Sequence, residues 1–362
     1  MEKNVDTIVP RLVFWELTRR CNLGCIHCRA EAGSEPLPGE FTTSEAKDFI
    51  LDLGRIGKPI LVLTGGEPLY RPDLFEIARF AGERGFSLAL ATNGTLIDRS
   101  AAERIASATF RRVSISLDGA ARETHDTFRG REGSFDQALA GLAQVRDSGV
   151  SVQVNTTIAR HNIGELDDIL ELALREKVSA LHFFLLVPVG CGAEIATEAM
   201  ISPREYEEAL GWIYDRSQEL SLEMRATCAP HYYRIVSQRE RERGRSFLPR
   251  REGMHAMTRG CLAGSGVIFL SYRGDVQPCG YLPLSAGNVR QASISTILSE
   301  SPLLRELRSP ELLKGKCGRC EFSRICGGCR ARAYGATGDY LAEEPFCTYL
   351  PKPARRDDSV AQ

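Results

Sequence analysis

The hydrophobic positions of residues 12–187 follow two alternating patterns. Short apolar runs, each close to a turn signal, predict six strands: Leu12–Leu17, Ile60–Thr64, Phe86–Thr92, Arg112–Leu117, Val150–Thr157 and Leu181–Val187. The longer segments between these runs place their apolar residues on one helical face, as do Ala46, Phe49, Ile50 and Leu53. Strands that alternate with amphipathic helices predict a parallel sheet with right-handed crossovers.

Several of the expected helices begin at recognisable capping sequences. Thr42–Glu45 fits a capping box, and Asp73–Glu76 and Ser134–Gln137 repeat its pattern. Ser202–Glu205 combines a capping serine, a first-turn proline and an acidic third position. We therefore expect helices to begin at these four points.

Six strand–helix units are too few for a closed eight-unit barrel, which typically needs ~250 residues. We therefore expect an α/β fold, a partial (β/α)6 TIM-like barrel over residues 10–190, with its active site at the C-terminal ends of the strands. A helical linker region at 191–255, a cysteine-rich extension at 256–351 and a disordered tail at 352–362 complete the expected organisation.

Length and charge narrow the class of protein. The chain has 362 residues, is 43% hydrophobic and 26% charged, and carries a formal net charge of −1, which gives no support to binding of nucleic acid. No apolar signal region opens the chain, and no run approaches the ~18 apolar residues of a membrane span. We expect a cytoplasmic protein without a membrane partner. The arginine-rich stretch 239–251 suits a solvated loop, or else a cationic rim for an anionic substrate.

Twelve cysteines are the unusual feature of the composition. Three lie close together near the start, seven lie between Cys261 and Cys347, and Cys191 and Cys228 lie alone between the two groups. In a reducing cytosol, clustered cysteines bind metal more often than they form disulfides. The grouping therefore predicts two metal-binding regions.

The first group, Cys21, Cys25 and Cys28, directly follows the first predicted strand. A structural zinc ion usually takes four nitrogen or sulfur ligands, so zinc would need His27 as well. Three thiolates suit a [4Fe-4S] cluster with one iron left open for a small molecule. Motifs after the later strands favour the cluster.

Glycine-rich and polar motifs follow the second to fifth strands. Thr64-Gly65-Gly66-Glu67-Pro68 combines glycines, which let a backbone approach a ligand closely, with a carboxylate that can accept from an ammonium. Asn93 ends the third strand, Ser116 ends the fourth, and Asn155 lies near the end of the fifth. For Asn93 and Asn155, hydrogen bonding at a turn or strand end is an equally good interpretation.

The Cys-x3-Cys-x2-Cys spacing and the Gly65–Pro68 motif together resemble the radical S-adenosylmethionine (SAM) superfamily. The resemblance implies a [4Fe-4S] cluster on the first three cysteines that cleaves SAM to methionine and a 5′-deoxyadenosyl radical, which takes hydrogen from a substrate. It also implies the cofactor-binding residues Gly65, Gly66, Glu67, Asn93, Ser116 and Asn155, the first three at the amino group of SAM. His27 departs from the family, which usually has an aromatic residue there.

Among the later cysteines, the run Cys317-x2-Cys320-x5-Cys326-x2-Cys329 could by itself be a zinc site. The whole layout resembles the SPASM extension of radical SAM enzymes, which carries auxiliary [4Fe-4S] clusters. The resemblance implies one cluster on Cys317, Cys320, Cys326 and Cys347, and three corners of a second on Cys261, Cys279 and Cys329. No cysteine shortly follows Cys261, so the second cluster keeps an open iron, borrows Cys228 or a histidine, or is absent.

Short sequence segments across residues 10–351 resemble the heme-forming branch of this family. They include Thr18–Cys21, Thr227–Tyr233, Thr258–Cys261, Pro278–Leu282 and Gly327–Arg332. That resemblance implies oxidative decarboxylation of two propionates of iron-coproporphyrin III, or a similar anionic tetrapyrrole, to vinyl groups, giving heme b. A ferredoxin or flavodoxin would supply low-potential electrons, and an auxiliary cluster would accept the electron left over. Arginines and lysines should line the pocket to bind carboxylates.

Candidate substrate contacts are His231, Tyr232, Tyr233 and Cys191. His231 could ligate the substrate iron or serve in packing, and a structural thiol is the favoured interpretation of Cys191. Loop salt bridges are at least as good an interpretation of three residues after the fourth strand, His125, Arg129 and Arg131.

Other functions stay open at this point. A related tetrapyrrole enzyme could remove acetate side chains from didecarboxysiroheme or make heme d1, and a SPASM maturase could act on a peptide. Such a maturase often has an extra N-terminal peptide-binding domain, whereas few residues precede the first strand here. A non-enzymatic iron–sulfur carrier or a zinc-stabilised interaction protein would explain the later cysteines but not Gly65–Pro68.

Overall fold

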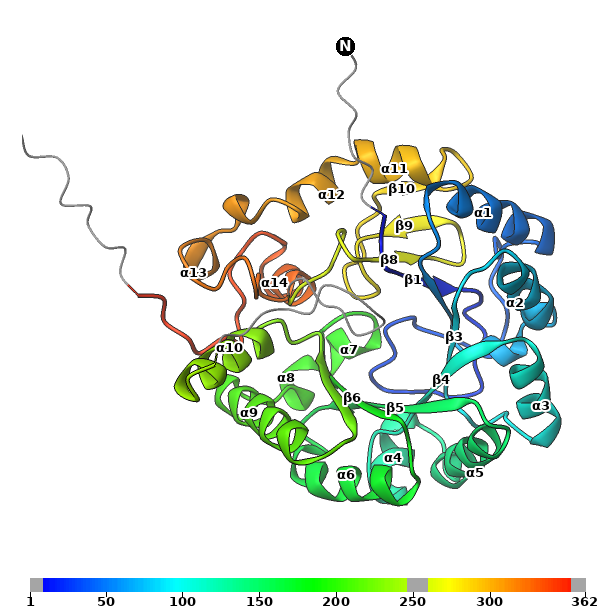
Figure 1. Cartoon of the computed structure of the whole chain (residues 1–362), viewed down its shortest axis with the longest axis horizontal. Helices are drawn as coiled ribbons and strands as arrows, with labels where there is room; N and C mark the ends of the chain where they lie inside the picture. Colours follow the sequence, from blue (N-terminus) through cyan, green and yellow to red (C-terminus); the bar gives the residue numbers. More distant parts are fainter. Residues whose placement is uncertain (1–8, 246–259, 353–362) are drawn as a thin grey trace, which may run out of the picture.

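The computed structural model describes residues 9–245 and 260–352, which form one twisted sheet wrapped by helices (Figure 1). The strand order is β10-β9-β8-β1-β2-β3-β4-β5-β6-β7. All neighbours from β8 to β7 pair in parallel, and β9 and β10 add an antiparallel extension. The strands are β1 Leu12–Glu16, β2 Ile60–Thr64, β3 Leu88–Thr92, β4 Phe110–Ser116, β5 Ser151–Ile158, β6 Ala180–Leu185, β7 Glu223–Thr227, β8 Val267–Leu270, β9 Asp275–Gln277 and β10 Gly287–Asn288.

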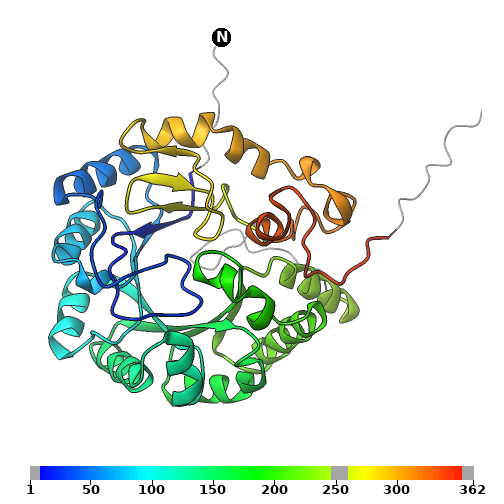
Figure 2. The ribbon, with the colours of Figure 1, turned by 180° about the vertical axis from the view of Figure 1, so that it is seen from behind.

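Helices form the outer layer of the barrel, and the last of them complete the ring. The longer helices are α1 Thr43–Ile56, α2 Leu74–Glu83, α3 Arg99–Ser107, α4 Arg122–Arg129, α5 Ser134–Asp147, α6 Leu166–Arg175, α9 Pro203–Glu219 and α10 Tyr232–Glu242. Shorter helices are α7 Cys191–Glu194, α8 Ala196–Ala199, α11 Ile294–Glu300, α12 Pro302–Leu307, α13 Gly315–Gly318 and α14 Arg330–Thr337. Figure 1 and Figure 2 show α11, α12 and α13 along the arc between α1 and α10, with α14 on its inner side.

The expected open α/β barrel is confirmed, and all six predicted strands are present with ends shifted by a few residues at most. The sheet is wider than expected, because β7 pairs with β6 at one edge and β8 pairs with β1 at the other. Strand β7 lies in segment 191–255, where we expected only a helical linker. Residues 246–259 and 353–362, with part of the arginine-rich stretch and almost all of the expected tail, lie outside the described residues.

Helices begin at all four expected points, but only two of the four have the expected side-chain cap. Thr42 and Glu45 cap α1 reciprocally, and Ser202 and Glu205 do the same for α9. The side chain of Asp73 makes no cap, because Arg71 and Thr43 take its oxygens at 2.7 and 2.6 Å.

Helix α5 begins at Ser134 itself, so Ser134 is not its cap. The carboxylate of Asp126, from the end of α4, accepts instead from the amides of Gly133 and Phe135 and from the Ser134 hydroxyl. A carboxylate from the preceding helix therefore replaces the expected cap, as helix termini permit.

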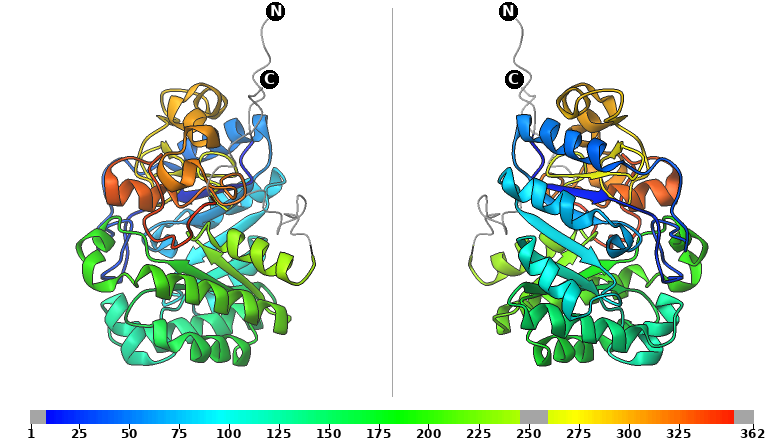
Figure 3. Two further views of the ribbon diagram at one scale, coloured as in Figure 1. Left: turned by 90° about the vertical axis from the view of Figure 1, so that its left-hand side faces the viewer. Right: turned by 90° about the vertical axis from the view of Figure 1, so that its right-hand side faces the viewer.

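The C-terminal extension is fastened to the barrel beside α1. Arg290 pairs with Glu45 at 2.9 Å, and the amide of Ile294 donates to the carboxylate of Asp52 at 2.7 Å. Both side views in Figure 3 place the dark-blue loop after β1 and the green α7 on one side of the barrel. That side holds the C-terminal ends of the parallel strands. None of the helices that the structure describes is both long and apolar enough to cross a membrane.

Candidate functional site

A pocket opens where the parallel strands end. Because the carboxyl ends of parallel strands meet at one edge of a sheet, residues far apart in sequence converge there. The pocket is lined by the loop after β1 and by residues that end the next strands: Thr64, Gly65, Gly66, Thr92, Asn93, Ser116, Asn155, Thr157 and Leu185–Val187. The structure therefore brings five of the six predicted SAM contacts into one wall, together with the first three cysteines.

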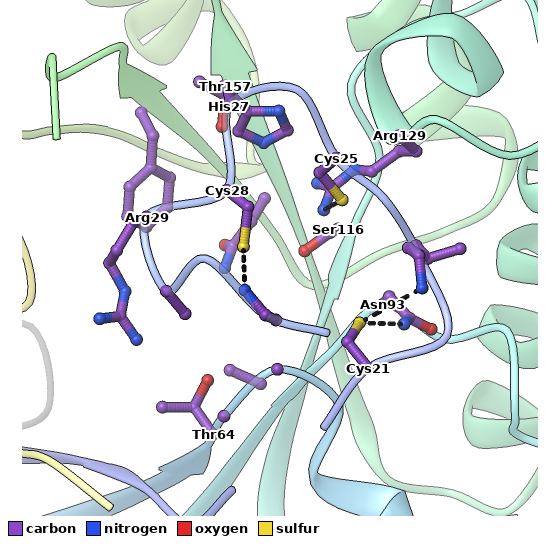
Figure 4. A pocket seen from close by; sticks show the side chains of 18 of the residues that line it. Cys21, Cys25, His27, Cys28, Arg29, Thr64, Asn93, Ser116, Arg129 and Thr157 are labelled. Atoms are coloured by element: carbon purple, nitrogen blue, oxygen red, sulfur yellow. Dashed lines mark hydrogen bonds between the residues drawn. The ribbon is translucent and has the colours of Figure 1, made fainter. Parts of the chain in front are cut away.

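Cys21, Cys25 and Cys28 carry their sulfur atoms around this pocket (Figure 4). The loop that holds them is fixed by backbone bonds from Cys21 N to Gly33 O at 2.7 Å and from Cys28 N to Cys25 O at 3.1 Å. The amide of Ala32 also points at the Cys28 sulfur, 3.5 Å away. These hydrogen bonds orient the loop that carries the three thiols.

The electrostatics of Cys21 and Cys25 suit a cationic group. Burial raises the pKa of Cys21 to about 11, and the charges of Glu67, Cys25 and Cys28 act in the same direction. Burial likewise raises the pKa of Cys25, against the opposing effect of Arg129. Bound iron would offset this burial and repulsion, so the donor set fits an iron–sulfur cluster.

All twelve cysteines are free thiols. Within 9–245 and 260–352, no group of three or more His, Cys, Asp or Glu side chains is placed so that it could hold a single metal ion.

Gly66 lets the loop after β2 pack directly beneath the loop after β1. A β-carbon at Gly66 would lie 2.5 Å from the carbonyl oxygen of Arg20, closer than atoms can approach. The same contact brings the Glu67 amide to the Arg20 oxygen at 2.7 Å. Because Arg20 precedes Cys21, the glycine motif and the first thiol are positioned together.

Glu67 is the one predicted cofactor contact that does not line the pocket. Its carboxylate is fully buried and accepts from the Thr92 hydroxyl, the Asn93 amide and the Leu69 amide at 2.8, 2.8 and 3.1 Å. Burial raises its pKa to about 7, although these hydrogen bonds oppose the shift. The group ties the glycine motif to the end of β3, and its contact with a bound ammonium stays a prediction.

Asn93, Ser116 and Asn155 lie along the pocket wall. The side-chain nitrogen of Asn93, Nδ2, is 3.8 Å from the Cys21 sulfur. It also donates to the side-chain oxygen of Asn22 at 2.9 Å. Ser116 and Asn155 are paired across β4 and β5. Asn93 therefore contacts a candidate cluster ligand directly, in addition to its hydrogen bonds within the turn.

Arg129 joins the thiol loop to a buried carboxylate that the sequence analysis did not single out. Its guanidinium is 2.6 Å from Asp118 and 3.8 Å from the Cys25 sulfur. Asp118 is fully buried and also accepts from the amide of Thr157 at 2.6 Å. His27 lies 3.6 Å from the same carboxylate, and its ring stacks on Phe128 at 3.9 Å.

The other two candidates after β4 contact the backbone. His125 accepts from the amide of Asp118 at 3.1 Å, and Arg131 donates to the carbonyl of Asn22 at 3.3 Å. These contacts favour the loop interpretation for both residues.

Arg29 and Tyr281 form the wall between the barrel and the C-terminal extension. Arg29 pairs with buried Glu16 at 3.2 Å, donates to the Gly280 carbonyl at 3.4 Å and stacks on Phe269. Arg29 and Arg129 are the cations among the described residues of the lining, and each is paired with a buried carboxylate.

Comparisons with known proteins agree with this geometry. The radical SAM superfamily matches residues 15–173, and the SPASM iron–sulfur cluster-binding domain matches residues 261–329. The AdoMet-dependent heme synthase of Methanosarcina barkeri is 49% identical over 345 residues, which cover 95% of this chain and 98% of that protein. The chain belongs to the radical SAM superfamily. This radical SAM enzyme binds SAM and a [4Fe-4S] cluster, and its SPASM domain carries auxiliary iron–sulfur clusters.

Two further matches are informative. The Fe-coproporphyrin III synthase of Methanosarcina barkeri is 34% identical, covering 94% of this chain and 88% of that protein. The crystal structure of Streptococcus suis SuiB bound to its precursor peptide shares the fold, with a TM-score of 0.73 at 17% identity over 94% of this chain and 76% of that one.

The SPASM cysteines of this radical SAM enzyme separate into two groups. Four of them line a second pocket: Cys317, Cys320, Cys326 and Cys347. The other three influence one another electrostatically: Cys261, Cys279 and Cys329. We call these sets the outer and the inner cysteine group. They match the division that the family resemblance implies, although Cys326 and Cys329 are only three residues apart.

The candidate substrate contacts do not line the first pocket, and one of them is tied to the first cysteine loop by a backbone hydrogen bond. His231 lines the second pocket, where its buried ring stacks on Tyr206 and neither ring nitrogen has a hydrogen-bond partner. This placement favours packing beside the outer group over contact with a substrate in the first pocket. Tyr232 and Tyr233 begin α10, with their rings edge to face. The amide of Cys191 donates to the Cys28 carbonyl at 3.0 Å.

Proposed function

We propose that this enzyme converts iron-coproporphyrin III to heme b by oxidative decarboxylation of two propionate side chains. The observation that carries the proposal is the 49% identity to an AdoMet-dependent heme synthase along 95% of the chain. A pocket that joins three thiols to a wall from the cysteine-rich extension is the site such a reaction needs.

We assign the cluster that binds SAM to Cys21, Cys25 and Cys28. The set of three thiols leaves one iron free for the amino and carboxylate groups of SAM, with Gly65, Gly66, Asn93, Ser116 and Asn155 around it. When bound and reduced, the cluster and SAM supply a 5′-deoxyadenosyl radical, which is the hard chemical step.

The protein's own groups tune this site. Asn93 and Arg129 place N–H donors 3.8 Å from the sulfurs of Cys21 and Cys25, and donors near a thiolate stabilise its charge and adjust the cluster potential. Asp118 holds Arg129 in position at 2.6 Å.

Each decarboxylation of the substrate releases one electron. A hydrogen atom leaves the propionate carbon next to the ring and becomes part of 5′-deoxyadenosine. Loss of CO2 and one electron from the substrate radical then gives a vinyl group. That electron needs an acceptor near the pocket, and Tyr281, which lies in the pocket wall, is two residues from Cys279 of the inner group.

The proposal predicts heme formation in an anaerobic assay with SAM, a low-potential reductant and iron-coproporphyrin III. Mass spectrometry should show loss of two carboxyl groups, each accompanied by one 5′-deoxyadenosine. Replacing the chemical reductant with reduced ferredoxin or flavodoxin should support the same product. A reaction without SAM is the matched control and should leave the porphyrin intact.

The result that contradicts the proposal is cleavage of SAM with iron-coproporphyrin III unchanged. The Fe-coproporphyrin III synthase at 34% identity makes another tetrapyrrole the next substrate to offer. Turnover of didecarboxysiroheme in the same assay would move this enzyme to a different tetrapyrrole step while keeping its radical chemistry.

A further inference from the structure

Cys228 adopts an unusual backbone conformation directly after β7. Its φ is +57°, a left-handed value that residues other than glycine rarely adopt. Its carbonyl is fixed by the guanidinium of Arg332 at 2.8 Å and the hydroxyl of Tyr206 at 3.3 Å. Strained residues that the surroundings hold in place cluster at functional sites. The position of this thiol is therefore set by the fold rather than by local preference.

The thiol of Cys228 lies with the inner cysteine group. Cys228, Cys279 and Cys329 belong to one apolar cluster, packed with Val187 and Leu282. Burial raises the pKa of Cys228 well above its usual value, and the charges of Cys329, Cys279 and Cys261 act in the same direction. Cys279 and Cys329 thus pack with Cys228 in one cluster, and the charge of Cys261 acts on the same thiol.

The backbone around Cys261 shows the same convergence. A β-carbon at Gly260 would lie 2.6 Å from the Pro230 oxygen and 2.8 Å from the Cys326 oxygen. The amide of Cys261 donates to that Cys326 oxygen at 3.0 Å. Gly260 therefore packs between the chain that follows Cys228 and the loop that leads to Cys329.

A buried ion pair connects Cys228 to Cys329. Arg332 and Glu344 pair at 3.2 Å with side chains 0% and 1% exposed. Arg332 donates to the Cys228 carbonyl, and Glu344 accepts from the Cys329 amide at 2.7 Å. One rigid pair thus fixes the backbone of both cysteines, as polar groups around metal ligands commonly do.

We propose that Cys228 is the fourth protein ligand of the inner auxiliary [4Fe-4S] cluster, together with Cys261, Cys279 and Cys329. Each of the four thiols loses its proton when it binds iron, and each corner of the cluster then has a thiolate. The inner cluster then has no open iron and does not bind substrate, and its role would be to accept the electron that the proposed decarboxylation releases. The ligand assignment rests on the auxiliary clusters of the SPASM domain, while the electron-acceptor role rests on the proposed decarboxylation.

The test uses the full chain reconstituted anaerobically, in a background where Cys21, Cys25 and Cys28 are alanine. Only auxiliary clusters then contribute iron, sulfide and electron paramagnetic resonance (EPR) signals. Cys228→Gly is the informative variant, because glycine removes the thiol and also relieves the positive φ. A loss of cluster in this variant cannot come from added backbone strain.

We expect Cys228→Gly to lose about half of the background's iron and sulfide, or to keep it with an EPR signal that added cyanide changes. Cys261→Ala should reproduce this result, and where the single variants lose the inner cluster the double variant should lose no more iron than either of them. Cys191→Ala, which removes a thiol outside both groups, is the matched control and should keep the full iron content.

Two results would overturn the assignment. In the first, Cys228→Gly keeps the background's iron and an EPR signal that does not respond to cyanide. In the second, the background protein itself responds to cyanide, which would show an open iron while Cys228 is present. Neither readout involves a porphyrin, so failure of the proposed substrate leaves this test intact.

Discussion

Replacing Cys21, Cys25 or Cys28 with alanine abolishes SAM cleavage, if these thiols hold the cluster that binds SAM. All three sulfurs surround one pocket, and no other cysteine lines that pocket. The reacting centre would be lost, so the rate of 5′-deoxyadenosine formation should fall at least about 100-fold, a small part of an enzyme's usual rate enhancement. Chromatography of anaerobic reactions with SAM and a chemical reductant measures the product.

Cys320→Ala provides the comparison for this loss. Cys320 belongs to the outer group and does not line the first pocket. This variant should still form 5′-deoxyadenosine, and the EPR signal of its reduced first cluster should still change when SAM is added. Wild-type rates in any of the three pocket variants would refute the assignment of the cluster.

Glu344→Gln is expected to lower the free energy of unfolding by about 3 kcal/mol. The ion pair of Glu344 with Arg332 has almost no solvent exposure. Glutamine keeps the shape of the side chain but leaves the guanidinium buried without its counter-ion, which is far more costly than losing an exposed pair. Anaerobic calorimetry at one scan rate should show the unfolding midpoint falling by several degrees.

An exposed ion pair of the same domain gives the control. Lys314 and Asp339 lie closer together, at 2.6 Å, but their side chains are 62% and 36% exposed. Asp339→Asn should therefore cost less than about 1 kcal/mol. Equal midpoints for the two variants would show that burial does not set the strength of the Arg332–Glu344 pair.

Periodicity predicted the elements of the barrel whose faces are clearly apolar. Strand Ile60–Thr64 was predicted with its observed bounds, because it is uniformly apolar and ends at a glycine turn. Strand β7 was missed because its sequence is short and polar. Its charged residues Glu223 and Arg225 pair with each other, and Glu223 also pairs with Arg112 from β4. Such cross-strand partners do not appear in a local pattern.

The residues of the site likewise include some that the sequence predicts and some that it does not. The first three cysteines stand out by spacing, since one loop carries all of them. Asp118, Arg29 and Tyr281 were not predicted as site residues, because only the folded sheet brings them to the pocket and its surroundings. Asp118 lies only two residues after the predicted contact Ser116, but its partner Arg129 is eleven residues further on and belongs to α4.

The most direct test of the account follows hydrogen from substrate to product. Iron-coproporphyrin III deuterated on the propionate carbons next to the ring is incubated anaerobically with enzyme, SAM and reductant. If the enzyme removes that hydrogen with a 5′-deoxyadenosyl radical, the 5′-deoxyadenosine should carry deuterium while the porphyrin becomes heme b. Heme b formed alongside unlabelled 5′-deoxyadenosine would contradict the account.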